Sequence, residues 1–318
     1  MSAIQIKKIA TKYPILRAVL YPVIAARRLL QKKNNLLLKE VTNNLSEILI
    51  GDPIIRVDEF EGVFAVDIRS DLFSRIVLNR HYEPQLAQLC RRYLDKNRDA
   101  IDVGANIGFY TVMFAKNLAQ QKVLSIEPAK STLQRLQRNV ALNGVMHKVE
   151  VFEGVASNRN GAVEIKTIKG KEEYSSLGAM DHPSITKEKW ALEEVMGATL
   201  DELVKQKSLD PGFLKVDVEG VEHLVFTGAK KVLSEKRPVI LSELSDFLLK
   251  RNGSSAREVI DLIKSHGYDV FDPINPSIQP GAKDFGDILC VPQERRERIN
   301  TRQGALSDSE SAALHCRR

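Results

Sequence analysis

The stretch "AIDVGANIGFYTVMFA", Ala100–Ala115, joins an apolar strand, an aspartate, a turn with two glycines and an amphipathic helix. Glycines at the end of a strand let the backbone pass close to a ligand, and the first amides of the following helix are free to bind one. Doubly wound α/β proteins hold the middle of a nucleotide-like cofactor in this way. The stretch therefore predicts a cofactor site and leaves open which cofactor it holds.

The periodicity around this stretch predicts a doubly wound α/β sheet of parallel strands with crossover helices. The expected strands are 98–103, 122–127, 148–153, 212–217 and 238–243, with later strands near 268–271 and 287–291. The expected helices are 107–118, 130–142, 220–234 and 254–266. We expect this domain to span 96–292, with a hairpin at 162–168 and a polar loop, "KGKEEYSSLGAMDHPS", inserted in it.

Three further segments flank the domain. Residues 46–95 alternate apolar and polar residues around Gly51-Asp52-Pro53 and predict short antiparallel strands within 48–68, followed by a helix near 83–95. Residues 293–318 contain few apolar side chains, so we expect a disordered tail. Residues 1–45 form a basic segment with an amphipathic helix after Pro22.

Composition and charge narrow the class of protein. Hydrophobic residues make up 43% of the 318, which is enough for a globular core. Cys90, Cys290 and Cys316 are odd in number, far apart and without a C-x-x-C pair, which argues against a disulfide framework or zinc site and fits the cytoplasm. The net charge is +6, but residues 1–40 alone carry +8, so we expect no nucleic-acid partner for the nearly neutral remainder.

Acidic residues end most of the predicted strands, where ligands of such sheets bind. The first strand ends at Asp102, before Gly104, Asn106 and Gly108, and the second ends at Glu127-Pro128, where a carboxylate would accept both hydroxyls of a ribose. The third ends at Glu153, with Ala156 beside the place for an adenine, and the others end at Asp217 and Glu243.

The chemistry of these ends separates two classes of cofactor. A dinucleotide requires G-x-G-x-x-G, because its pyrophosphate contacts the turn. This chain has D-x-G-x-N-x-G instead. S-adenosylmethionine has no phosphate and carries a cationic sulfonium, so acidic strand ends such as Asp102 and Asp217 suit it better. The pattern favours a methyl donor over NAD.

At this point the chain resembles the FkbM-type methyltransferases. The resemblance covers about 80–245 and is carried by "HYEPQLAQL", "AIDVGANIGFYTVMFA", "VLSIEPAKSTLQRLQRNVALNG", "VEVFEGVASNRNGAVEI", "TLDELV", "FLKVDVEGVEHLVFTGAKKVL" and "RPVILSEL". It implies a class I fold with an antiparallel last strand, S-adenosylmethionine as cofactor, and O-methylation of a hydroxyl on a sugar, glycan or related metabolite.

The residues that would carry this chemistry follow from the strand ends and from the matched motifs. The predicted cofactor-binding residues are Glu83, Asp102, Gly104, Asn106, Gly108, Phe109, Glu127, Pro128, Glu153, Ala156 and Asp217. Asp217 or Glu219 is the candidate base for the acceptor hydroxyl. No metal is expected.

Other interpretations stay open for several of these residues. Glu127 could be an acid favoured by a helix dipole, and Asp217 could cap the following helix. A divalent metal could instead be held by Asp217, Glu219, Glu222 and His223. The alternative is that these side chains are simply solvated at the start of a helix. For the whole chain, the alternatives are an NAD-dependent oxidoreductase and a membrane-associated binding module with a vestigial cofactor fold.

The basic segment 1–40 leads to two expectations. Its apolar stretch is interrupted by arginines and two prolines, so it is too short to span a bilayer. The segment also lacks the cleavage site of a signal peptide. Its helix would lie on an anionic membrane and bring the enzyme to a lipid-linked acceptor, or pack on the sheet or on a second subunit. A membrane-bound helix would detach as salt shortens the Debye length, whereas a packed helix would be indifferent to salt.

Overall fold

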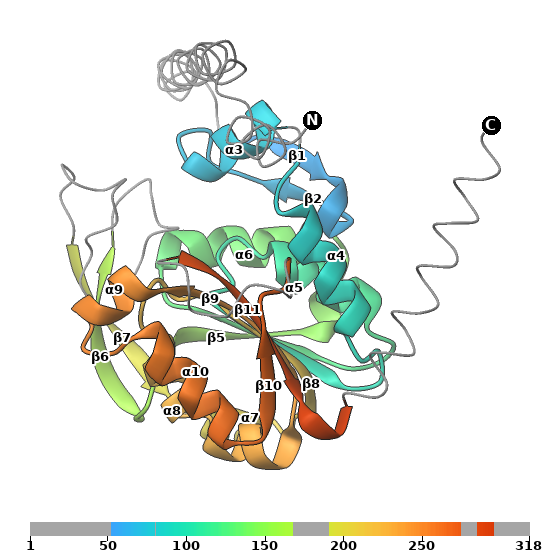
Figure 1. Cartoon of the computed structure of the whole chain (residues 1–318). Helices are drawn as coiled ribbons and strands as arrows, with labels where there is room; N and C mark the ends of the chain where they lie inside the picture. The colour runs from blue at the N-terminus through green and yellow to red at the C-terminus, as the bar shows by residue number, and fades with distance from the viewer. Residues whose placement is uncertain (1–51, 80, 168–190, 275–284, 296–318) are drawn as a thin grey trace, which may run out of the picture.

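The computed structural model describes residues 52–79, 81–167, 191–274 and 285–295 (Figure 1). The expectations for the basic segment 1–45, for the polar loop from Lys169 on and for the tail beyond Arg295 lie outside these residues and stay predictions. The predicted start of the disordered tail at 293 is wrong, because Gln293–Arg295 form the 3-10 helix η5 and Glu294 pairs with Arg237 at 2.6 Å. Within the described ranges, no helix is both long and apolar enough to cross a membrane.

A single large sheet forms the centre of the molecule, and in the described residues it has nine strands. Their order across the sheet is β10-β11-β9-β8-β3-β4-β5-β7-β6. Their bounds are β3 Asp99–Val103, β4 Val123–Glu127, β5 Val149–Ala156, β6 Gly161–Thr167, β7 Ala191–Ala198, β8 Pro211–Val216, β9 Val239–Ser245, β10 Tyr268–Phe271 and β11 Phe285–Pro292.

The directions of the strands confirm the expected class I fold. Strands β5, β4, β3, β8 and β9 are parallel to one another. Strand β11, the last strand of the described residues, runs antiparallel to both β9 and β10. The order reverses after β3, β4 and β5, because β8 returns to the other side of β3. That reversal is the switch point at which such sheets bind ligands.

Helices cover both faces of the sheet, as Figure 1 shows. On one face lie α4 (Pro84–Tyr93), α5 (Phe109–Asn117) and α6 (Lys130–Leu142), and on the other lie α7 (Leu200–Gln206), α8 (Glu222–Thr227) and α10 (Ala256–Ser265). Each face has its own apolar core. In α5 every residue from Phe109 to Ala115 is buried, so the prediction of an amphipathic helix here is wrong: no side of this stretch faces solvent.

Helix α5 is buried all round because a small β element covers its outer side. This element comprises β1 (Ile54–Val57), the turn η1 (Asp58–Phe60) and β2 (Gly62–Ala65), followed by α3 (Asp71–Asn79). Strands β1 and β2 pair antiparallel, as the sequence predicted. The Phe60 ring stacks on the Phe109 ring at 5.0 Å between centroids, and Phe64 meets the same ring edge-on at 4.5 Å. The element therefore shares the apolar core of the sheet.

Two predictions about the second half of the chain are wrong. The helix expected at 220–234 is two pieces, α8 and the π-helix η4 (Val232–Lys236). Helix α8 ends with Gly228 as its C-cap. The backbone passes so close to residue 157 there that a Cβ on Gly228 would lie 2.0 Å from the Ser157 carbonyl oxygen. The hairpin expected at 162–168 is one strand, β6, whose antiparallel partner is β7. That partner is remote in sequence, so no local turn signal could reveal the pair.

Three helices were missed. These are α3, α7 and α9 (Asp246–Arg251). Each begins with a recognisable cap: the Ser70 hydroxyl accepts the Phe73 amide of α3, the Thr199 hydroxyl accepts the Glu202 amide of α7, and the Ser245 hydroxyl accepts the Leu248 amide of α9. Such caps are a sequence signal for helix starts, and short helices between strands are found by them rather than by periodicity.

Gly104 allows the first test of this fold. Its φ is +74°, and a Cβ there would lie 1.8 Å from the Asp217 carbonyl oxygen. Gly104→Ala should therefore lower the free energy of unfolding by more than the roughly 1–2 kcal/mol of a left-handed alanine alone. Gly253→Ala is the control, because Gly253 has a φ of +79° and open space around it. Urea unfolding that gives equal losses for both variants would contradict the close approach.

Candidate functional site

A cavity of about 370 Å³ opens at the carboxyl ends of the central strands. Its volume falls within the range of small-molecule sites, and its position at the switch point is where such sheets bind ligands. Its walls come from α3, α4, the turn after β3, the start of α5, and the ends of β4, β5, β8, β9 and β11. The predicted residues that line it are Glu83, Gly104, Asn106, Phe109, Glu127, Pro128, Ala156, Asp217 and Glu219.

Glu127 lies against the turn that follows β3. Its Oε2 accepts the Asn106 amide at 2.9 Å and its Oε1 accepts the Ala129 amide at 3.0 Å. Each oxygen therefore keeps a lone pair for a ligand in the cavity. Burial raises the pKa of Glu127 to about 7 despite these two bonds. The interpretation as a mere helix-dipole acid does not account for a carboxylate that also lines the cavity.

Three predicted cofactor residues do not line the cavity. Asp102 is buried behind the turn, where its Oδ2 accepts the Thr111 hydroxyl at 2.7 Å, and burial raises its pKa. Gly108 begins α5 with a φ of +91°. Glu153 is exposed, and its carboxylate accepts the Gln137 amide at 3.3 Å. Asp102 and Gly108 support the turn from behind, whereas Glu153 faces away from it.

The other end of the cavity is rich in carboxylates. Glu83, Asp217, Glu219, Glu243 and Asp287 all line it. Glu83 accepts the Tyr110 hydroxyl at 2.7 Å. Glu243 of β9 and Asp287 of β11 lie directly opposite each other across the two strands. Like charges in directly opposite positions destabilise a sheet, so the arrangement is not explained by folding.

Burial and mutual repulsion change the acidity of these groups. Burial, followed by the charges of Asp217 and Glu222, raises the pKa of Glu219 to about 8. Burial, with Glu83 and Asp217, raises the pKa of Asp287 to about 7. The pKa of Glu243 is raised well above its ordinary value, again chiefly by burial. Burial and mutual repulsion therefore favour the protonated forms of Glu219, Glu243 and Asp287.

Lys215 is a buried cation at this end of the site that the sequence analysis missed. Its side chain is buried, with Nζ 3.2 Å from Asp217 Oδ2 and 4.6 Å from the centre of the Tyr110 ring. The signal was present, because residues two apart on a strand share a face, and Lys215 precedes Asp217 by two. Asp287 and Arg75, which also line the cavity, gave no local signal.

The two open interpretations of the Asp217 region can now be compared with the structure. Helix α8 begins at Glu222 with Val221 as its N-cap, so Asp217 does not cap it. Glu222 is buried outside the cavity lining, and its Oε1 accepts the Gly220 amide at 3.0 Å. Among the described residues, no group of three His, Cys, Asp or Glu side chains is placed to hold a metal ion.

A comparison with protein families identifies the class of the chain. Residues 102–270, more than half of the 318, match the model of the methyltransferase FkbM domain. The chain belongs to the FkbM methyltransferase family. This confirms the resemblance that the motifs indicated.

Individual relatives are more distant. The chain is 28% identical over 159 residues to methyltransferase sdnD of Sordaria araneosa, covering 42% of this chain and 61% of that protein. It is 27% identical over 142 residues to methyltransferase 1 of Beauveria bassiana (strain ARSEF 2860), covering 40% and 57%. The chain thus spans less than two thirds of the length of either relative.

Among solved structures, the precorrin-6y C5,15-methyltransferase of Geobacter metallireducens GS-15 aligns with a TM-score of 0.39 and 11% identity. The alignment covers 66% of this chain and 87% of that one.

The carboxylate end predicts an unusual dependence of stability on pH. The folded protein holds the Asp287 proton up to about pH 7, whereas the reference pKa is 3.8. The free energy of unfolding should therefore fall as pH rises between these values, by up to about 1.4 kcal/mol per pH unit for this group. Asp287→Asn should make the decline shallower in urea titrations from pH 4 to 8. Asp261→Asn, at an exposed position on α10, is the control, and equal slopes in both variants would refute the assignment.

Proposed function

We propose that this FkbM-family protein is an S-adenosylmethionine-dependent methyltransferase. Its acceptor would be a hydroxyl oxygen of a sugar, a glycan or a related metabolite. The observation that carries the proposal is the division of one cavity into two ends, with Glu127 at one and five carboxylates around Lys215 at the other. The family match supports methyl transfer, and the choice of oxygen as acceptor rests on the resemblance and on the chemistry below.

The residues of the cavity fit this cofactor. The Glu127 carboxylate keeps lone pairs for the two ribose hydroxyls. Pro128, Gly154 and Ala156 offer small apolar surfaces for an adenine. The carboxylate end suits the sulfonium and the ammonium of the methionine part, both cationic. The volume of about 370 Å³ lies within the range expected for a ligand of this size.

Catalysis would consist of positioning and proton removal. S-adenosylmethionine supplies an electrophilic methyl group, and an in-line displacement requires the acceptor oxygen to be held close to that carbon. A sugar hydroxyl is weakly acidic, so a base must take its proton. Glu219 has a pKa of about 8, which makes it a stronger base than an ordinary glutamate and keeps it poised near neutral pH. Asp217, paired with Lys215, raises that pKa by its charge.

The cofactor assignment is tested at Glu127. Glu127→Ala removes charge-assisted acceptors worth on the order of 1.5–3 kcal/mol each, so calorimetry with S-adenosylmethionine should give at least a roughly tenfold weaker Kd. The Kd of Glu127→Gln, which keeps one acceptor oxygen, should lie between those of the native chain and Glu127→Ala. Glu153→Ala is the control, because Glu153 pairs with Glu127 in register but is exposed.

The same titrations separate the rival functions. An NAD-dependent oxidoreductase would bind NAD in place of S-adenosylmethionine, and a binding module with a vestigial fold would bind neither. If folded Glu127→Ala binds S-adenosylmethionine as tightly as the native chain, the ribose assignment falls.

The base is tested by pH profiles with whichever hydroxylated sugar supports turnover. Glu219→Gln should lower kcat by roughly 10²–10⁴-fold while S-adenosylmethionine still binds. Asp217→Asn should keep an active base but move the acidic limb of the profile, along which Glu219 loses its proton, to lower pH, because the Asp217 charge helps raise the pKa of Glu219. The reverse result, with the limb abolished only by Asp217→Asn, would assign the base to Asp217. If neither variant changes turnover, both candidates are wrong.

A further inference from the structure

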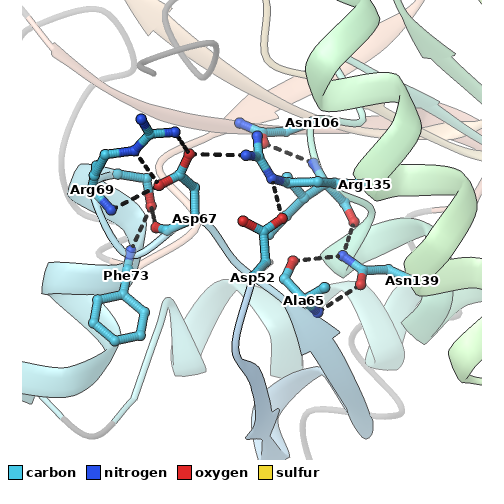
Figure 2. A network of polar contacts seen from close by, with 10 residues as sticks. Asp52, Ala65, Asp67, Arg69, Phe73, Asn106, Arg135 and Asn139 are labelled. Atoms are coloured by element: carbon cyan, nitrogen blue, oxygen red, sulfur yellow. Dashed lines mark hydrogen bonds and ion pairs between the residues drawn. The ribbon is translucent and has the colours of Figure 1, made fainter. Parts of the chain in front are cut away.

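Helix α6 and its C-cap residue present three polar side chains, four residues apart, to β2 and to the residues just beyond it, and Figure 2 shows two of them, Arg135 and Asn139. Arg135 Nη2 donates to Asp67 Oδ2 at 2.9 Å, just beyond the end of β2. Asn139 Oδ1 accepts the Ala65 amide at 2.7 Å, and its Nδ2 donates to the Ala65 carbonyl at 3.2 Å. Asn143 bonds Val63 in the same way, at 3.1 and 2.7 Å.

The spacing of these contacts matches a helix to a strand. Four residues of a helix rise about 6 Å, and two residues of a strand rise roughly 6.6 Å. Alternate residues of β2 send their N–H and C=O groups to the same edge, away from β1. The two asparagine amides therefore satisfy Val63 and Ala65 as a neighbouring strand would. Helix α6 thus completes an edge that the small β element could not complete alone.

Asn139 differs from Asn143 in a further contact. Its Nδ2 also donates to the Ile107 carbonyl at 2.8 Å, in the turn that follows β3. Asn139 is fully buried, and this one amide makes three hydrogen bonds to two separate segments. Asn143 Nδ2 instead donates to the Asn139 carbonyl, within α6. Of these two asparagines, Asn139 joins the β element to the turn that lines the cavity and Asn143 does not.

The contact reaches the proposed ribose site through one residue. Asn106 precedes Ile107, has a φ of +49°, and donates its amide to Glu127. A left-handed asparagine of this kind keeps its conformation only when its surroundings hold it. Without Asn139, the Ile107 carbonyl would lose its buried partner, which favours rotation of the turn.

We infer that Asn139 is a positioning residue for the cofactor. It fixes the turn at Ile107, and so holds the Asn106 amide against the Glu127 carboxylate. The β element becomes part of the cofactor site through this amide, although β1 and β2 line no part of the cavity. The identity of the ligand, S-adenosylmethionine, rests on the proposed function. The effect of Asn139 on the turn at Ile107 does not.

The test compares Asn139→Ala with Asn143→Ala. Both variants should lower the melting temperature, because each loses the amide that satisfies one residue of β2. Hydrogen exchange in the absence of ligand should quicken by about tenfold or more at the Asn106 and Ile107 amides in Asn139→Ala, while Asn143→Ala leaves them near the native rate. Calorimetry should show S-adenosylmethionine binding roughly fivefold to tenfold more weakly to Asn139→Ala only.

A second variant covers poor folding of Asn139→Ala. Asn139→Asp keeps the acceptor for the Ala65 amide but cannot donate to Ile107 when ionised, so it should reproduce the exchange and affinity changes. Equal exchange at Asn106 in the Asn139 and Asn143 variants would overturn the inference. If the native chain binds no S-adenosylmethionine but the Asn106 and Ile107 amides still exchange faster in Asn139→Ala than in Asn143→Ala, the proposed function is wrong and the coupling of Asn139 to the turn is confirmed.

Discussion

The close approach of Gly104 to the Asp217 carbonyl is the constraint on which the site depends. A Cβ at residue 104 would overlap that oxygen at 1.8 Å, so only glycine lets the turn after β3 lie against the end of β8. The approach places two acidic strand ends, Glu127 and Asp217, on the walls of one cavity. It also brings the turn within reach of Glu127, whose carboxylate then holds the Asn106 amide.

The carboxylate end of the cavity opposes folding rather than supporting it. Glu243 and Asp287 face each other across two strands, and Lys215 forms an ion pair with Asp217 at 3.2 Å. Their raised pKa values record that the folded chain favours their protonated forms. Sites that sacrifice stability in this way are typical of function, because a cationic ligand recovers the lost interaction.

The site extends beyond the residues that match the family model. Residues 102–270 contain the turn, Glu127 and Asp217, but Arg75 and Glu83 precede them and Asp287 follows them, and all three line the cavity. The β element contributes indirectly, since its rings cover α5 and its backbone bonds α6. The segments outside the matched domain thus contribute residues to the cavity.

The sequence by itself determined the alternation of strands and helices, the glycine turn at 104–108 and the acidic strand ends, because periodicity and glycine positions express local backbone geometry. It also predicted the antiparallel last strand through the family resemblance, and β11 confirms it. Only the tertiary structure decided that Glu153 faces away, that β6 pairs with β7, that Asp287 opposes Glu243, and that Asn139 reaches Ile107. These contacts join segments tens of residues apart, and they depend on strand register and helix docking, which no local pattern of side chains encodes.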